Sequence, residues 1–277
     1  MSAVGRYLIL IMLLGWAAVA AAETAIEFPE RARQGDLLMG RAPPGSHVEA
    51  GGHRIAVGEH GRFVVGLDRD APDSLEVRIE RPSGEVVSRR VEVASRDYAI
   101  ERIDGLPEDK VSPRSEETLN RIRREAALVS RARQRNDERS DFLTGWRWPA
   151  TGRVSGVYGS QRILNGKPRQ PHYGVDIAVP AGTPVHAPAD GVVSLVHEGM
   201  FFSGATLMLD HGQGLSSTFL HLQRIQVAEG ERVARGDVIA TVGASGRATG
   251  PHLDWRMSWF DRRVDPTQLV SEMPESP

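Results

Sequence analysis

The sequence predicts an all-β protein in which one helix joins two β domains. Short segments of alternating apolar and polar residues fill the first part of the chain, and a helical period follows them. Glycine-rich segments of β-forming residues fill the remainder. At 277 residues the chain is longer than one average domain requires, so two separate cores are expected.

Residues 24–98 have the pattern of a small β-sandwich. Gly51-Gly52 lies between two strand-like segments as a two-residue hairpin turn. Leu75, Val77 and Ile79 share one face by the period of two. The expected strands are Asp36–Arg41, His47–Ala50, His53–Val57, Arg62–Val65, Leu75–Ile79 and Val86–Val93. We therefore predict an immunoglobulin-like sandwich here.

A charged helix is predicted over residues 112–138. Ser112-Pro113 supplies an N-cap and a first-turn proline. Apolar residues then recur at helical spacing at Leu119, Ile122, Ala126 and Val129. Two interpretations remain open, because this stripe either packs the helix against a domain or belongs to a solvated linker.

Residues 147–268 form the second predicted β domain. Glycine, valine and histidine become frequent there, and tight turns separate the candidate strands Gly191–Val196, Ala205–Asp210 and Thr218–Leu222. Six of the nine histidines fall inside this segment. That clustering makes the second domain the place to look for chemistry.

The first residues have the features of a secretory signal peptide over residues 1–22. Arg6 precedes an apolar run from Tyr7, which ends in Ala20-Ala21-Ala22 before Glu23. An uncleaved N-terminal anchor is the alternative interpretation. We expect the mature chain to work outside the cytoplasm, and no later segment has the ~20 continuous apolar residues that a membrane span requires.

Composition excludes several classes of function. Forty per cent hydrophobic residues and a net charge of −2 are typical of a soluble globular protein and give no electrostatic support for nucleic-acid binding. The chain has no cysteine, which excludes a disulfide framework and a thiolate site. Any metal must therefore be held by His, Asp or Glu.

Two short motifs offer metal ligands. His172 and Asp176 are four residues apart, and in a fully extended strand they would stand ~13 Å from one another. The chain must bend between them to share one ion, and Gly174 permits a bend. His252 and Asp254 are two apart on a predicted strand, so they share a face at about 6.6 Å between Cα atoms.

A further histidine, His221, lies on an apolar strand, where alone it would be a core residue with one hydrogen bond. The joint pattern resembles the lysostaphin-type, or LytM-like, family of peptidoglycan metalloendopeptidases over about Val154 to Leu269. The segments that carry this resemblance, in chain order, are Pro171–Ala178, Gly182–Pro188, Asp190–Val193, Leu209–Gly212, Phe219–Leu222 and Gly243–Leu253.

The resemblance implies a site and a fold. It implies a β domain of the duplicated hybrid motif type, zinc ligands at His172, Asp176 and Asp254, and catalytic histidines at His221 and His252. The family's final HxH motif reads His-Leu-Asp here, so Asp254 stands where the third ligand is usually histidine. Carboxylate oxygen binds zinc at nearly the same distance as imidazole nitrogen, but we expect a more anionic site in which manganese competes.

The implied function is an exported zinc metalloendopeptidase that hydrolyses the peptide cross-links of peptidoglycan in the periplasm. Its target would be the stem peptides, at a bond between D-Ala and diaminopimelate. The alternative is a non-catalytic relative that binds peptidoglycan or activates a cell-wall amidase. A periplasmic adaptor with a lipoyl-like domain is a third interpretation, but it leaves the His/Asp set unexplained. A monomer is the default expectation.

The segment Gln161–Gln170 precedes His172 and contains Arg162, Asn165 and Lys167. It forms either one wall of the substrate groove or a solvated hairpin loop. The remaining histidines of the second domain, His186, His197 and His211, are assigned to structure or surface.

Overall fold

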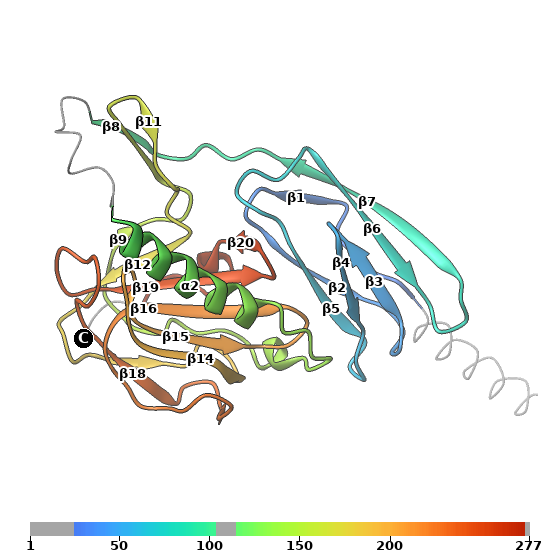
Figure 1. The fold of residues 1–277 in the computed structure, drawn as a ribbon. Helices are drawn as coiled ribbons and strands as arrows, with labels where there is room; N and C mark the ends of the chain where they lie inside the picture. The colour runs from blue at the N-terminus through green and yellow to red at the C-terminus, as the bar shows by residue number, and fades with distance from the viewer. Residues whose placement is uncertain (1–24, 104–114, 275–277) are drawn as a thin grey trace, which may run out of the picture.

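The computed structural model describes residues 25–103 and 115–274, and these residues confirm a mostly β protein with one α-helix. The predicted signal segment 1–22 lies outside the described residues. Among those described, no helix is both long and apolar enough to cross a membrane. Figure 1 shows the N-terminal strands apart from a second group of strands that has helix α2 in front of it.

The N-terminal unit contains two sheets. The larger has the order β1-β7-β6-β3-β4, and β2 pairs with β5 in a second sheet. Gly51 and Gly52 both have positive φ, which confirms the predicted hairpin turn between β3 and β4. The bounds are β1 Arg31–Arg33, β2 Leu37–Arg41, β3 His47–Ala50, β4 His53–Ala56, β5 Arg62–Gly66, β6 Ser74–Glu80 and β7 Val86–Ala94. The finer assignment to an immunoglobulin-like sandwich remains a prediction.

The second unit is built on a ten-stranded sheet whose main path is β17-β14-β15-β16-β19-β12-β9. Its strands are β9 Arg153–Gly156, β12 Gly174–Ala178, β13 Pro184–His186, β14 Gly191–Met200, β15 Gly204–Asp210, β16 Leu215–Ile225, β17 Arg232–Val233, β18 Val238–Val242, β19 Leu253–Trp259 and β20 Arg262–Val264. Two 3₁₀ turns, η2 Asp141–Thr144 and η3 Pro266–Leu269, complete it. Trp255 and Trp259 are among its largest fully buried side chains, so β19 lies in the core.

The two units share one continuous hydrophobic cluster. The Gln213 side chain joins them directly, since its amide oxygen accepts from the Val64 N–H and its amide nitrogen donates to the Arg62 carbonyl. The His53 ring stacks on Phe260 at 4.2 Å between centroids. These contacts tie the N-terminal sheets to the β19–β20 end of the larger sheet (Figure 1).

Helix α2 spans Glu116–Arg133 and packs against β14 and β15. Ser115 is its N-cap, accepting from the Thr118 N–H, while the predicted cap Ser112-Pro113 lies outside the described residues. Ala132, with Leu128 and Val129 beside it, contacts Leu195, Met200 and Met208. The helix is thus a packed connector, which resolves the question that the sequence left open.

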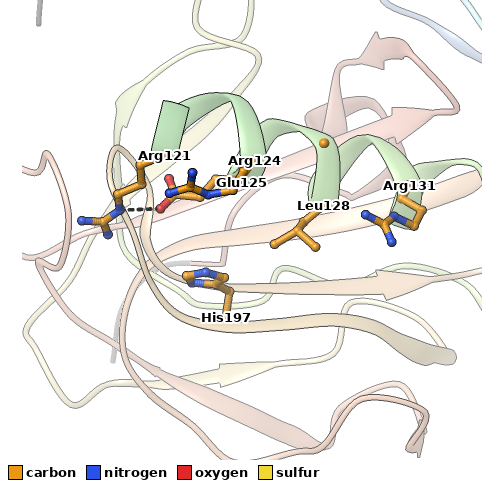
Figure 2. Close-up of a pocket in the computed structure, with 7 residues that line it drawn as sticks. Arg121, Arg124, Glu125, Leu128, Arg131 and His197 are labelled. Atoms are coloured by element: carbon orange, nitrogen blue, oxygen red, sulfur yellow. Dashed lines mark hydrogen bonds and ion pairs between the residues drawn. The ribbon is translucent and has the colours of Figure 1, made fainter. Parts of the chain in front are cut away.

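The packed face of α2 matches the predicted stripe only in part, because Ile122 is half-buried and Val129 packs against the core. Leu119 and Ala126 are exposed, whereas Glu125 is buried. The Glu125 carboxylate accepts from the Phe201 N–H at 2.8 Å and from Arg121 Nε at 2.7 Å, so its burial is compensated. Figure 2 shows Arg121 and Glu125 on the helix near His197 of β14. These residues line a hollow of about 560 Å³. A hydrophobic stripe cannot reveal a buried carboxylate of this kind.

The segment Gln161–Gln170 forms a small sheet outside the main one. Strands β10 Gln161–Leu164 and β11 Lys167–Pro168 form a hairpin, and β8 Ile100–Ile103 pairs in parallel with β10. Asn165 and Gly166 have positive φ at the hairpin turn. The chain leaving the N-terminal unit therefore adds a strand to the hairpin that precedes His172.

Candidate metal centre

The candidate residues meet because three strands lie side by side. Asp176 on β12 is paired with Asp254 on β19, and Asp254 is paired in turn with Leu220 on β16. His221 follows Leu220 directly, and His252 directly precedes β19. Sheet register thus brings together residues that lie up to 82 positions apart in the chain.

Three of these side chains form a group of the size of one metal site. His172, Asp176 and Asp254 each offer a ligand atom within 4.8 Å of the other two. His172 Nε2 lies 3.2 Å from Asp176 Oδ1, and His252 Nε2 lies 3.9 Å from the same oxygen. Ligand atoms held ~2.1 Å from a tetrahedral zinc ion would stand about 3.4 Å apart, so only a small closure is needed.

Two of the candidate ligand atoms have no hydrogen-bond partner in the protein. His172 Nε2 and Asp176 Oδ1 are both buried and have no hydrogen-bond partner, although they face one another at 3.2 Å without hydrogen-bond geometry. Ten buried side-chain polar atoms of the described residues lack a partner, but these two face one another beside Asp254. A cation between them would satisfy both atoms, so this side of the group fits a metal ion.

Asp254 has a different environment. It is 2% exposed, and its oxygens accept from Arg256, with Nε 2.9 Å from Oδ1 and Nη2 2.5 Å from Oδ2. Burial is the largest single effect and acts to raise the pKa of Asp254, but the charge and hydrogen bonds of Arg256, together with His172 and His221, hold this pKa below its ordinary value. A carboxylate has about four lone-pair positions, so it can accept from Arg256 and still face a metal ion.

Arg256 changes the expected charge of the centre. The two carboxylates contribute −2, and the guanidinium returns the formal charge of the group to −1. One aspartate with two neutral histidines would also carry −1. The ligand set thus keeps the extra negative charge expected from Asp254, but Arg256 offsets it. Sequence reasoning on the ligands omitted this arginine, two positions further along the same strand face.

The two candidate catalytic histidines expose the same ring nitrogen. His221 Nδ1 lies 2.8 Å from the Ser245 carbonyl and His252 Nδ1 lies 2.9 Å from the Gly250 carbonyl. A carbonyl only accepts, so each Nδ1 carries the proton and each neutral ring keeps a lone pair on Nε2. The rings lie 4.8 Å apart between centroids.

His221 is held in an unusual backbone conformation. It is a non-glycine residue with φ of 60°, at an irregular part of β16, and its N–H donates to the Ser203 carbonyl. Such strain is tolerated where neighbouring contacts hold the backbone in place. Here the Ser245 hydroxyl holds β15 and β16 beside His221, since it donates to the Leu222 carbonyl and accepts from the Ala205 N–H. Burial lowers the pKa of His221, against the opposing effects of the Ser245 carbonyl and Asp254.

Glycine makes room for each carboxylate. Gly156 is paired with Asp176, and a Cβ at position 156 would lie 2.3 Å from Asp176 Oδ2. A Cβ at Gly174 would lie 2.7 Å from Asp254 Oδ1 and 2.5 Å from Arg256 Cγ. Gly174 has no positive φ and lies in strand β12, where the steric room it leaves is its visible role. His172 precedes the strand.

The other histidines of this unit have structural contacts, as expected. His211 is fully buried between the Asp190 carbonyl and the Ser217 hydroxyl, and burial lowers its pKa to about 4. His186 Nδ1 lies 2.8 Å from the Gly236 carbonyl. His197 lines the hollow beside α2, and none of the five candidate site residues does so.

The second unit thus combines an all-β fold with a partly buried His/Asp group sized for one metal ion. The sequence profile of peptidase family M23 matches residues 170–266, which include every candidate site residue. A solved structure assigned to peptidase M23 from Pseudomonas aeruginosa is 34% identical, with a TM-score of 0.68, and the match covers 84% of this chain and 92% of that one. The chain belongs to peptidase family M23.

Two curated relatives come from Vibrio cholerae. The peptidoglycan DD-endopeptidase ShyA is 32% identical over 178 residues, which are 62% of this chain and 40% of the relative. The peptidoglycan DD-endopeptidase ShyB is 41% identical over 95 residues, or 34% of this chain and 22% of the relative. The chain thus spans between about a fifth and two fifths of the length of these relatives.

Proposed function

We propose that this protein is an exported, zinc-dependent endopeptidase that hydrolyses peptide cross-links in peptidoglycan. The observation that carries the proposal is the convergence of His172, Asp176 and Asp254 with two histidines whose Nε2 atoms are free to accept a proton. Membership of family M23 supports peptidase activity. The names of ShyA and ShyB support peptidoglycan as the substrate.

His172, Asp176 and Asp254 would hold the zinc ion. When bound, zinc supplies a Lewis acid that polarises the scissile carbonyl and makes water more acidic. His172 Nε2 and Asp176 Oδ1 are available for this because they have no hydrogen-bond partner. Asp254 joins them with its charge shared between the ion and Arg256.

His221 and His252 would manage the proton and the developing negative charge. In its neutral form each ring has a lone pair on Nε2 and can accept the proton of the attacking water. Once protonated, the same nitrogen donates a hydrogen bond to the oxygen of the tetrahedral intermediate or passes the proton to the leaving amine. The Ser245 and Gly250 carbonyls keep both rings oriented throughout, because each continues to accept from Nδ1.

The substrate would be the stem peptides of peptidoglycan, cut at a bond between D-Ala and diaminopimelate. We assign the β10–β11 hairpin, braced by β8, to one wall of the substrate groove because it directly precedes His172 in the chain. Export through the segment 1–22 would place the enzyme in the periplasm, where this substrate lies.

Metal analysis and digestion of isolated wall sacculi test the proposal together. We expect about one zinc per purified chain and release of cross-link products, with activity in His252→Ala lowered by about 10²- to 10⁴-fold. His197→Ala is the matched control, since His197 lies beside α2 and should leave hydrolysis unchanged. A wild-type chain that binds zinc yet releases no products would rule out the catalytic function.

A second candidate function is favoured by one observation, the occupation of both Asp254 oxygens by Arg256. If the ion pair excludes zinc, the domain would bind peptidoglycan without cutting it, or activate a cell-wall amidase. A metal-free chain that still sediments with sacculi would support this alternative. Retention of His172, Asp176, His221 and His252 in one group favours the enzyme.

A further inference from the structure

Asp254 and Arg256 form one unit on the face of β19 that carries the metal group. They are two residues apart, so their side chains leave the strand on the same side. The guanidinium makes three contacts with the carboxylate, at 2.5, 2.9 and 3.1 Å. Such a planar, multiple contact fixes the orientation of both groups more strongly than a single hydrogen bond does.

The strand beside this pair is shaped to accommodate it. Gly174 on β12 is paired with Arg256, and a Cβ there would overlap Arg256 Cγ and Asp254 Oδ1 as well as the Trp255 carbonyl oxygen. Every side-chain hydrogen bond recorded for Arg256 among the described residues goes to Asp254. The Arg256 side chain is 26% exposed, whereas that of Asp254 is 3% exposed. The carboxylate is thus held by arginine while one of its oxygens lies within 4.8 Å of ligand atoms of His172 and Asp176.

The charge of the group explains why a second carboxylate needs this partner. With zinc bound, His172, Asp176 and Asp254 would sum to zero, whereas one aspartate with two histidines sums to +1. Arg256 restores +1. A centre of zero net charge polarises a carbonyl less strongly than a centre of +1, because the ion's field is offset by its ligands. Aspartate and arginine together have the same net charge, zero, as one neutral histidine in this position.

We infer that Arg256 is a positioning and charge-compensating residue, which orients Asp254 as third metal ligand and keeps the loaded centre at a net charge of +1. This inference rests on the proposed metal-binding function. Arg256 itself touches neither the ion nor the substrate and acts through Asp254.

A double-mutant cycle on zinc affinity tests this role without relying on hydrolysis. Zinc binding to the purified full chain would be measured by competition with a chromophoric chelator for the wild type, Arg256→Met, Asp254→His and the double variant. Arg256→Met should weaken zinc binding by about 10- to 100-fold, because Asp254 loses the contacts that orient it. Asp254→His alone should also weaken it, since an unpaired guanidinium then lies beside the ion.

The double variant distinguishes the inference from a merely structural ion pair. With histidine at position 254, loss of Arg256 should strengthen zinc binding by about tenfold or more. The effect of Arg256→Met on zinc affinity therefore reverses sign between Asp254 and histidine at that position. Arg256→Lys keeps the charge and should bind zinc more tightly than Arg256→Met. If Arg256→Met has the same effect with either residue at 254, the inference is wrong. Thermal unfolding of each variant with chelator present verifies that the fold is retained.

The outcomes separate this inference from the proposed function. A wild-type chain that binds no zinc, but gains it in Arg256→Met, would overturn the inference and support the non-catalytic alternative. A cycle that changes sign as expected, in a chain that hydrolyses no sacculi, would retain the inference and overturn the proposed activity.

Discussion

The two carboxylates of the metal group show how differently one sheet can hold the same chemical group. Asp176 on β12 has a buried Oδ1 without a hydrogen-bond partner, and it faces two histidines at 3.2 and 3.9 Å. Asp254 on β19 is nearly inaccessible, and both of its oxygens accept from Arg256. Asp176 thus keeps one oxygen without a hydrogen bond, whereas both oxygens of Asp254 already accept hydrogen bonds.

This difference has an energetic consequence. A buried carboxylate oxygen without a hydrogen bond, such as Asp176 Oδ1, costs free energy that a metal ion would recover, and it contributes little to folding. A paired carboxylate contributes to folding without a metal, but shares its charge when the metal binds. If the proposed site binds zinc, Asp176 on β12 would serve binding alone, whereas Asp254 on β19 would serve both binding and folding stability.

The largest expected effect comes from neutralising each carboxylate in turn. Asp176→Asn should abolish zinc binding while leaving the metal-free chain as stable as the wild type, because no cation partner is lost. Asp254→Asn should weaken zinc binding and also lower the free energy of unfolding by roughly 1–3 kcal/mol, since Arg256 loses a charged acceptor. Zinc content and urea unfolding with chelator present measure the two effects, with Asp73→Ala as an exposed control.

Equal destabilisation by both asparagine variants would contradict the comparison. It would mean that the apparent freedom of Asp176 Oδ1 does not exist in solution, and that both carboxylates have partners in the metal-free chain.

The sequence predicted much of this arrangement. Strand segments such as His47–Ala50 and the hairpin turn at Gly51-Gly52 are confirmed because alternation and turn chemistry are local properties. The five candidate site residues converge, and ordered family motifs were the signal that grouped them. Their roles as ligands and catalysts remain predictions.

What the sequence did not predict depends on contacts across the sheet. The role of Arg256 requires knowing that Asp254 is buried and that position 174 leaves room for a guanidinium. Ser245 was passed over because its function lies in backbone contacts to β15 and β16. Glu125 was missed since polar residues are expected outside. For Arg256, the one signal available in the sequence was its i, i+2 spacing from Asp254 on a predicted strand.

An intermediate effect is expected from filling the space beside each carboxylate. Gly156→Ala places a methyl group against Asp176 Oδ2 and removes no ligand. Zinc affinity should fall by about 10- to 100-fold, as when a supporting residue is changed. Gly174→Ala should lower zinc affinity and also the stability of the metal-free chain, because its methyl group meets the ion pair and the Trp255 carbonyl oxygen. Gly199→Ala is the matched control, since no atom lies within 4 Å of a Cβ there.

If Gly156→Ala destabilised the metal-free chain as much as Gly174→Ala does, the proposed difference between Asp176 and Asp254 in their contribution to folding would be contradicted. Gly156 would then be required by the fold of β9 rather than by Asp176.

The smallest expected effect concerns pH and links Asp254 to His221. Burial lowers the pKa of His221 below 6.5, although the Asp254 carboxylate and the Ser245 carbonyl oppose this. A general base must be neutral, so hydrolysis should fall on the acid side only below about pH 6.5, the ordinary histidine pKa. A rate profile from pH 5 to 8 measures the limb, and a midpoint above 7 would contradict the assignment of His221 as base.

A second histidine, His211, makes folding depend on pH in the same acid range, so folding must be measured together with activity. The pKa of His211 is lowered to about 4 in the folded chain by burial. The unfolded chain therefore takes up this proton first, and the stability that His211 contributes is lost as pH falls from about 6.5 towards 4. Circular dichroism at each pH separates unfolding from protonation of His221. A decline in rate while the fold persists belongs to the metal centre, where Asp254 and His221 act on one another.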